Sequence, residues 1–535
     1  MEPVKQAGGL KRSTLGVILL IVVAGALAVV WKVVAPRLAH RQQKELIEET
    51  SDARKFSETL NVAGDSWLGY FVLRSPYFRR LMQEGGVKYQ FLDDHARYGE
   101  RMAKLAKGAY DIVVATVDSY ILNARGHQYP GVILFVIDES NGGDAIVAGP
   151  KVATIDDLNH PRIRIALTPA SPSEFLLKAT ASHFNLEILK HPGPWRVETE
   201  GAEEALAKLR ANAVDAAVLW EPEVSRALKL PGVKKLTSTA ESDDLIIDIL
   251  VAHRRLVKEK PELVARFVKA YFEALYYYRK DEEILLEQAA NDAKTASPED
   301  ARTMLAGIEF VNFTENCHYW FGIGEAIFSP QEKLPEIIED TVAIFRDTGD
   351  LDSDPLEGDP YRIMNSGFLA DLYTTGFTGG SVLRSKFSTS PTPEATPAPA
   401  PLPPISEAAW EKLRRVGTLK ILPVYFTSGS DLLTAEDKLE IDRIAKILAH
   451  YPRYRILVEG HSSPGSDPEA DRELSLRRAE VIRQYLVRVH GIDPNRIRAV
   501  GLGSERQLPR KPGESYRAYR ARNQRAEFVF LEDPF

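Results

Sequence analysis

Residues 456–489, ILVEGHSSPGSDPEADRELSLRRAEVIRQYLVRV, predict a strand, a loop and a helix in succession. The aliphatic run at 456–458 indicates a strand that ends in Gly460-His461, where glycine lets the backbone turn close to a ligand. Apolar residues then recur at spacings of three, four and three, as in a helix with one face packed on a sheet: Ala479, Ile482, Leu486 and Val489. The pattern predicts an α/β unit in which Arg478 lies near the start of the helix and points toward this loop.

Short motifs flank this unit on both sides in a fixed order. Stretches at 424–430 and 439–448 precede it, and Gly501-Leu502-Gly503 and the run RNQRAEF at 522–528 follow it. In this order the motifs resemble the OmpA-like peptidoglycan-binding domain, over essentially all of residues 406–535. The resemblance implies an α/β sandwich that binds the bacterial cell wall.

The same resemblance implies a site for the diaminopimelate of the peptidoglycan stem peptide. The family grips this zwitterion with a loop aspartate and an arginine, because a carboxylate and a guanidinium complement its amine and carboxylates. Arg478 matches the arginine, whereas Ser463 occupies the aspartate position, so Asp467 or Asp471 would supply the carboxylate. The expected peptidoglycan-binding residues are His461, Ser463, Asp467, Asp471, Arg478, Asn523 and Arg525. The alternative is that Arg478 forms only a surface ion pair and the domain is a scaffold.

Residues 58–375 alternate short apolar runs with helical stretches, which predicts a second α/β domain. A series of motifs in this part resembles the periplasmic substrate-binding proteins of importers for nitrate, taurine, alkylsulfonates and thiamine-pyrimidine precursors. The motifs lie at 64–70, 108–113, 141–145, 155–158, 166–177, 214–222 and 260–264. The resemblance implies two α/β lobes that close on a ligand by a hinge motion.

The candidate ligand site follows from where the expected strands end, because ligands of open α/β sheets lie outside the carboxyl ends of strands. The expected ligand-binding residues are Asp65, Trp67, Tyr70, Asp118, Ser171, Ser173, Trp220 and Glu221. Two alternatives stay open: Ser173 is a plain helix N-cap, and the aromatic residues are core. The matched loops contain no obvious arginine partner for Asp65, Asp118 and Glu221. If two of these acids face the ligand, it carries an amine or is a cationic heterocycle.

The N-terminal part predicts a membrane anchor. Residues 1–14 are basic and expected in the cytoplasm, residues 15–35 are apolar apart from Lys32 and predict a transmembrane helix, and 36–57 predict a helical stalk. A cleaved secretory signal is the alternative reading of the apolar run. Residues 376–405 are rich in proline and predict a semi-rigid linker, or alternatively a ligand for a recognition domain.

Composition excludes several kinds of function. The chain has 535 residues with 68 basic and 75 acidic side chains, so its net charge of −7 gives no basic field for nucleic acid. Cys317 is the one cysteine, which excludes intramolecular disulfides and cysteine-rich zinc sites. The histidines are isolated, and we find no nucleophile elbow, phosphate loop or His-Glu-x-x-His motif. We therefore expect no metal, no cofactor and no enzymatic activity.

Together these features predict a solute receptor anchored in the inner membrane by a single span, with its soluble domains in the periplasm. We expect the central domain to bind a small molecule and the C-terminal domain to attach to peptidoglycan. The expected output is delivery to the permease of an ABC importer or a signal to a membrane partner. The alternative is an envelope scaffold that links the inner membrane to the cell wall without transport.

Overall fold

The structure is a computed structural model of the chain. It describes residues 31–32, 40, 42–43, 46–47, 50–51, 55–184, 186–294, 297–324, 332–379, 402–419, 431–463 and 467–533. By its internal contacts the chain divides into a smaller unit of residues 1–59 and 83–88 and a larger unit of residues 60–82 and 89–535. In the smaller unit the described residues between 40 and 50 are helical, as expected for the predicted stalk.

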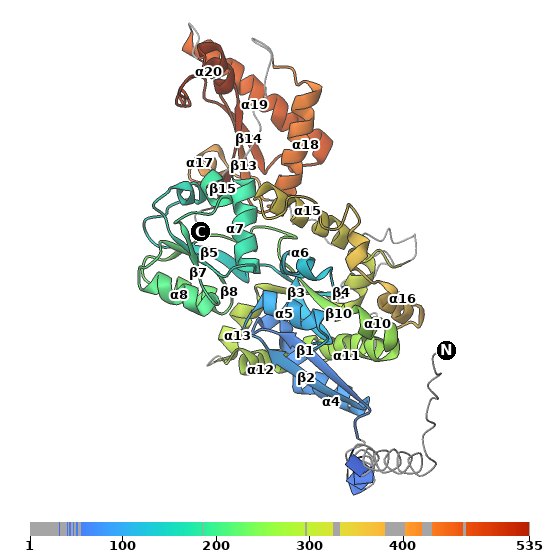
Figure 1. The fold of residues 1–535 in the computed structure, drawn as a ribbon. Helices are drawn as coiled ribbons and strands as arrows, with labels where there is room; N and C mark the ends of the chain where they lie inside the picture. Colours follow the sequence, from blue (N-terminus) through green and yellow to red (C-terminus); the bar gives the residue numbers. More distant parts are fainter. Residues whose placement is uncertain are drawn as a thin grey trace, which may run out of the picture. The chain divides into compact units, whose positions relative to one another are not determined.

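The central part of the larger unit contains two sheets, as the two-lobed prediction requires (Figure 1). The first sheet has six strands in the order β11-β4-β10-β3-β1-β2. Their bounds are β1 Glu58–Gly64, β2 Val87–Asp93, β3 Ile112–Thr116, β4 Gly131–Ser140, β10 Ile247–His253 and β11 Ile308–Phe310. β1 and β3 are parallel with Val62 opposite Ile112, and β10 runs antiparallel to both β3 and β4.

The second sheet has five strands in the order β7-β6-β8-β5-β9. Their bounds are β5 Asp144–Ala148, β6 Ile165–Leu167, β7 Arg196–Glu198, β8 Ala216–Trp220 and β9 Lys234–Ser238. Helix α7 (Pro172–His183) packs on β5 and β8, while α8 (Ala202–Arg210) packs on β6 and β8. Small and branched side chains from α8, β5, β8 and α9 (Glu223–Leu228) form the core of this lobe, which explains the close helix–sheet packing.

Two segments cross between the lobes, one from β4 to β5 and one from β9 to β10. Thr239 joins them: its Oγ1 lies 2.8 Å from Ser140 Oγ and accepts a hydrogen bond of 2.8 Å from the Gly142 N–H. Paired crossing segments of this kind are where a two-lobed protein bends, because few residues need to change their dihedrals.

The first lobe carries most of the helices. The first group is α3 Phe71–Arg74, α4 Pro76–Glu84, α5 Tyr98–Ala106, α6 Val117–Ala124, α10 Arg254–Glu259 and α11 Pro261–Arg279. The second group is α12 Glu282–Ala293, α13 Pro298–Leu305, α14 Phe313–Glu315, α15 Lys333–Asp347 and α16 Gly367–Thr374. Aromatic side chains fill the space between α11 and the sheet, where Phe135 contacts Tyr271 and Phe272.

The C-terminal part is a four-stranded sheet in the order β12-β15-β13-β14, with helices beside it. The elements are α17 Glu407–Trp410, β12 Arg414–Thr418, α18 Ala435–Ala449, β13 Arg455–Gly460, α19 Pro468–His490, β14 Ile497–Gly501, α20 Tyr516–Asn523 and β15 Ala526–Glu532. Figure 1 shows α18 beside α19, and α19 packs on β13 and β14. The predicted strand and helix of residues 456–489 are therefore present, while residues 464–466 between them lie outside the described residues.

The predicted membrane anchor and most of the linker lie outside the described residues. Residues 15–30 and 33–35 of the expected span, and 380–401 of the expected linker, belong to the part that the structure does not describe. Among the described residues, none belongs to a helix that combines the length and hydropathy needed to cross a bilayer.

Candidate functional site

A small cavity lies between the two lobes of the central domain, at the ends of their strands. Its volume is about 20 Å³, which is room for about one water molecule. The lining residues are Asp65, Trp67, Tyr70, Tyr98, Thr116, Asp144, Pro172, Trp220, Ile246 and Asp248. The structure thus brings together four of the predicted ligand-binding residues, Asp65, Trp67, Tyr70 and Trp220.

Strand ends explain how residues distant in the sequence meet here. Asp65 follows β1 and Thr116 ends β3 in the first lobe, while Trp220 ends β8 and Asp144 begins β5 in the second. Asp144 and Trp220 are opposite each other in antiparallel register. A cavity lined from both lobes changes shape when the lobes open or close, as a ligand-binding cleft must.

Asp65 is held by a buried arginine that the sequence analysis did not identify. Arg101 in α5 donates from Nη2 to Asp65 Oδ2 at 2.9 Å, and it also forms an ion pair with Asp94. The arginine is fully buried, and its Nη1 donates to the Val114 carbonyl oxygen at 2.9 Å. The matched loops indeed supply no arginine to Asp65; its partner comes from helix α5, which the sequence analysis did not consider.

The two predicted aromatic residues of the first lobe hold a pair of buried acids. Trp67 Nε1 donates to Asp138 Oδ1 at 3.2 Å, and the Tyr70 hydroxyl donates to Asp248. Burial raises the pKa of Asp138 to about 7, and burial together with the charge of Asp138 raises the pKa of Asp248 well above its usual value. At neutral pH this pair therefore retains protons that ordinary carboxyl groups have lost.

Asp118 and Asp144 add two more carboxyl groups at the cleft. Asp118 lies in the first turn of α6, which Thr116 caps, and Asp118 Oδ1 is buried without a hydrogen-bond partner in the described structure. Burial raises the pKa of both acids to about 7. Nearby carboxylates raise it further: Asp144 acts on Asp118, and Glu221 and Asp65 act on Asp144. Asp118 itself does not line the cavity, but Thr116 two residues before it does.

Three other predicted ligand-binding residues use their polar atoms within the second lobe. The Ser171 hydroxyl donates to the Thr168 carbonyl oxygen at 2.6 Å, and Ser173 Oγ donates to the Val218 carbonyl oxygen at 3.1 Å. Glu221 accepts hydrogen bonds from Ser225 Oγ at 2.7 Å and Ser225 N at 3.2 Å. Ser171, and not Ser173, occupies the N-cap position of α7, so the plain N-cap reading of Ser173 does not match the geometry.

Sequence reasoning missed Tyr98, Asp138, Asp144 and Asp248. Asp248 lies second in the apolar strand β10, and Asp138 lies near the end of the apolar strand β4. A charged residue inside a buried strand was the available signal, because such a group needs a partner or a function.

The predicted peptidoglycan site is built on β13, α19 and α20. Arg478 is buried on α19; burial lowers its pKa, and Asp431 is the acid that opposes this shift. Ser463 Oγ accepts from Arg520 Nε at 3.4 Å and from Gln524 Nε2 at 3.2 Å. At the position where the family has an acid, this chain therefore carries a hydroxyl within reach of a second arginine.

The remaining predicted residues of this site have structural partners. Asp467 caps α19 by accepting from the N–H groups of Glu469 and Ala470, and Asp471 follows in the first turn. Asn523 Oδ1 accepts from the Leu508 N–H at 2.8 Å, which fixes the segment before α20. These partners favour a supporting role for Asp467 and Asn523.

His461 belongs to a buried charged cluster with Glu459 and Glu527. One ring nitrogen of His461 and one carboxylate oxygen of each glutamate lie within 4.8 Å of one another, and His461 Nε2 is 3.4 Å from Glu527 Oε2. Arg415 and Arg506 both bind Glu459, and Arg525 binds Glu527 at 2.7 Å. The three guanidinium groups already balance the two carboxylates, so the arrangement is that of an ion-pair network.

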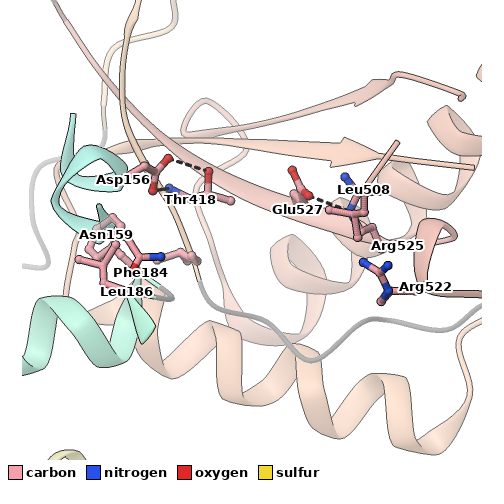
Figure 2. A pocket seen from close by; sticks show the side chains of 11 residues that line it. Asp156, Asn159, Phe184, Leu186, Thr418, Leu508, Arg522, Arg525 and Glu527 are labelled. Atoms are coloured by element: carbon pink, nitrogen blue, oxygen red, sulfur yellow. Dashed lines mark hydrogen bonds and ion pairs between the residues drawn. The ribbon is translucent and has the colours of Figure 1, made fainter. Parts of the chain in front are cut away.

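A larger cavity of about 470 Å³ lies where residues of the second lobe meet β12 and β15 (Figure 2). Asp156 accepts there from the Thr418 N–H at 3.1 Å and lies 3.2 Å from Thr418 Oγ1. Phe184 lines the same cavity and packs edge to face on Phe530 of β15. Arg522 and Arg525 line the opposite side, which makes part of this wall basic.

The C-terminal part is an OmpA-family domain, since residues 425–521 match that family. A peptidoglycan-associated lipoprotein of Rhizobium meliloti (strain 1021) is 36% identical over 85 residues, which are 16% of this chain and 48% of the relative. Outer membrane porin F of Pseudomonas fluorescens is 34% identical over 101 residues, which are 19% of this chain and 31% of the porin. The chain spans about half the length of the lipoproteins that it matches.

The central part is similar in fold to solved binding proteins. The periplasmic aliphatic sulphonate binding protein SsuA from Escherichia coli aligns with 56% of this chain and 94% of its own, with 15% identity and a TM-score of 0.43. The ligand binding component of an ABC-type import system from Staphylococcus aureus, with zinc bound, aligns with 58% of this chain and 98% of its own. Its identity is 12% and its TM-score is 0.43.

Proposed function

We propose that this protein is a small-molecule receptor of the bacterial envelope that is tethered to peptidoglycan. The central domain binds a solute in the cleft between its lobes, and the C-terminal OmpA-family domain attaches the receptor to the cell wall. The observation that carries the proposal is the cavity lined by polar and aromatic side chains from both lobes, in a chain that also has a wall-binding domain.

The proposal also covers the anchor and the output. The apolar run at 15–35 would hold the receptor in the inner membrane with both domains in the periplasm. The receptor would then deliver its ligand to an ABC importer permease or signal to a membrane partner. We propose binding and not catalysis, because two carboxyl groups of the lining already have protein partners: Asp248 accepts from the Tyr70 hydroxyl and Asp65 from Arg101.

A thermal-shift screen of the full chain tests the receptor function. The ligand classes are sulfonates, nitrate, pyrimidines, amines and amino acids. A ligand that binds only the folded state adds about 2.7 kcal/mol at a hundredfold excess over its Kd, so its effect on the melting temperature is measurable. A flat response to every class would contradict the receptor and favour the envelope scaffold.

Co-sedimentation with purified peptidoglycan tests the tether. We expect Arg478→Ala to lose binding, because Arg478 is the buried guanidinium of α19 that matches the family arginine. Arg477→Ala is the matched control, since Arg477 is an exposed neighbour whose guanidinium forms an ion pair with Glu473 at 2.8 Å. Equal sedimentation of both variants and the unmodified protein would remove Arg478 from the site.

A further inference from the structure

The cleft cavity is acidic on both sides. Asp65 and Asp248 line it from the first lobe and Asp144 from the second, whereas its lining contains no lysine, arginine or histidine. Asp118 and Asp138 lie close enough to add to this field: Asp144 raises the pKa of both. An anion placed here would meet carboxyl groups from both lobes and no basic side chain of the lining.

The basic residues near the cleft are already engaged with other acids. Arg101 binds Asp94 as well as Asp65, so its single positive charge is shared between two carboxylates. Lys178 lies 2.8 Å from Glu174 and also binds Asp350. Lys178 also acts on Asp118, whereas no basic side chain acts on Asp138, Asp144 or Asp248 among the described residues.

Aromatic rings form a second feature of the lining that is independent of the acids. Trp67, Tyr70 and Tyr98 from the first lobe and Trp220 from the second all line the cavity. Electron-rich ring faces attract ammonium groups, and combined aromatic and acidic linings are characteristic of sites for alkylated amines. A third observation comes from Asp118, which follows the lining residue Thr116 by two positions and does not itself line the cavity. Its Oδ1 is buried without a hydrogen-bond partner in the described structure, which is costly for an acceptor.

We infer that the ligand of this cleft is an organic cation, whose ammonium group lies between Asp144 of the second lobe and Asp248 of the first. This inference rests on the proposed function of the cleft as a solute site. Asp144 acts electrostatically on both Asp248 and Asp118. A cation beside Asp144 stabilises the ionised form of this acid, while Asp248, whose pKa lies well above its usual value, keeps its proton. Because the present cavity has room for about one water molecule, the lobes must separate to admit the cation.

The charge of the ligand has a consequence for pH. Burial raises the pKa of Asp118, Asp138 and Asp144 to about 7, so a cation that requires one of them ionised must displace a proton. The affinity for a cation then increases from pH 6 to pH 8, by about tenfold for one such group. An anionic ligand would show the opposite dependence.

The experiment is a thermal-shift and calorimetric comparison on the full chain at pH 8. The probes are methylammonium, tetramethylammonium and choline, with 3,3-dimethyl-1-butanol as the neutral analogue of choline and propane-1-sulfonate as the anion. We expect at least one ammonium probe to bind, the alcohol and the sulfonate not to bind, and the ammonium affinity to fall by about tenfold at pH 6. Asp144→Asn should abolish ammonium binding, while the exposed control Asp352→Asn should keep it.

The outcomes separate this inference from the proposed function. If the sulfonate or the alcohol binds and no ammonium probe does, the inference of a cationic ligand is wrong, while the proposed receptor function still holds. Ammonium binding that Asp144→Asn leaves unchanged would overturn the position between Asp144 and Asp248. No binding by any of these probes, together with a flat response to all the classes in the wider screen, would overturn the receptor itself. The folded state of Asp144→Asn is checked by its own melting temperature, since replacing a buried acid by an amide preserves the shape of the side chain.

Discussion

Arg101 shows how a single side chain sets the charge of the cleft. It is fully buried, and it forms ion pairs with Asp65, which follows β1, and Asp94, which follows β2. Without it, two buried carboxylates would face each other with no counter-charge. Arg101 therefore stabilises the fold mainly because it compensates two buried negative charges, and less through the strength of each ion pair.

Arg101→Ala should lower the free energy of unfolding by about 3–5 kcal/mol, because it leaves Asp65 and Asp94 unpaired in the interior. Urea unfolding of the full chain, followed by circular dichroism, measures the change. Arg97→Ala is the control: Arg97 is exposed and lies 3.7 Å from Glu100, so its loss should cost less than about 1 kcal/mol. Similar losses for the two variants would contradict the importance of the buried network.

Asp144 predicts a dependence of stability on pH. Its pKa is about 7 in the folded protein because of burial, against an ordinary value of 3.8, so the folded state binds the proton more tightly. The resulting stabilisation is complete below about pH 4 and is lost as the pH rises through 7, by up to about 4 kcal/mol. Asp144→Asn should therefore raise the melting temperature of the ligand-free protein at pH 8 and flatten its decline between pH 5 and pH 8. A decline as steep as that of the unmodified protein would show that Asp144 is not the titrating group.

At the level of elements, α19 lies unusually close to its sheet because two strands end in glycine. A Cβ atom at Gly460 would meet the Ser475 carbonyl oxygen, and one at Gly501 would meet the backbone of Arg472 and Leu476. The last residues of β13 and β14 thus allow the helix that carries Arg478 to pack against them. Gly460 and Gly501 therefore allow the backbone of α19 to lie close to the ends of β13 and β14.

Gly501→Ala should destabilise the C-terminal domain by about 1–3 kcal/mol, since backbone atoms of α19 must move to admit the methyl group. Peptidoglycan co-sedimentation should weaken with it, because Arg478 lies on the displaced helix. Gly126→Ala is a suitable control, as no atom lies within 4 Å of its added Cβ. An unchanged melting profile for Gly501→Ala would contradict the close packing.

The bounds of β13 and α19 show how far sequence patterns predict where an element begins and ends. The predicted strand at 456–458 is present but extends over Arg455–Gly460, and the predicted helix begins as early as Pro468. The early start follows from Asp467, which caps the helix, and from proline at its first position. Asp467, predicted as a ligand contact, therefore serves as the capping residue of α19.

At the scale of the whole molecule, the chain combines two sites with different chemistry. The interlobe cleft lies at the carboxyl ends of β1, β3 and β8 and the amino ends of β5 and β10, and the predicted peptidoglycan site lies on α19 and the residues after β13. No residue belongs to both proposed sites, so their binding energies should be additive.

We expect ligand binding and wall binding to be separable by mutation in the full chain. Asp144→Asn should leave peptidoglycan co-sedimentation unchanged, and Arg478→Ala should leave the response to the cleft ligand unchanged. Measuring both properties on both variants, and on the double variant, completes the cycle. A change of more than about threefold in the remote property would show that the two sites are coupled.

The sequence by itself determined the kinds of domain and their order. Short apolar runs, the helical spacing of Ala479, Ile482, Leu486 and Val489, and the glycine at the end of the strand are local features, and local features predict elements reliably when they are long and regular. They sufficed for the two-lobed α/β domain, the OmpA-family domain and four of the ten residues that line the cleft cavity: Asp65, Trp67, Tyr70 and Trp220. The tertiary structure alone decided which side chains face one another. It paired Arg101 with Asp65 and brought Asp144 of one lobe near Asp248 of the other. It also gave the side chains of Ser171, Ser173 and Glu221 hydrogen-bond partners within their own lobe. The physical reason is that charge and hydrogen bonding act through space at distances of a few ångströms, whereas these partners are far apart along the chain.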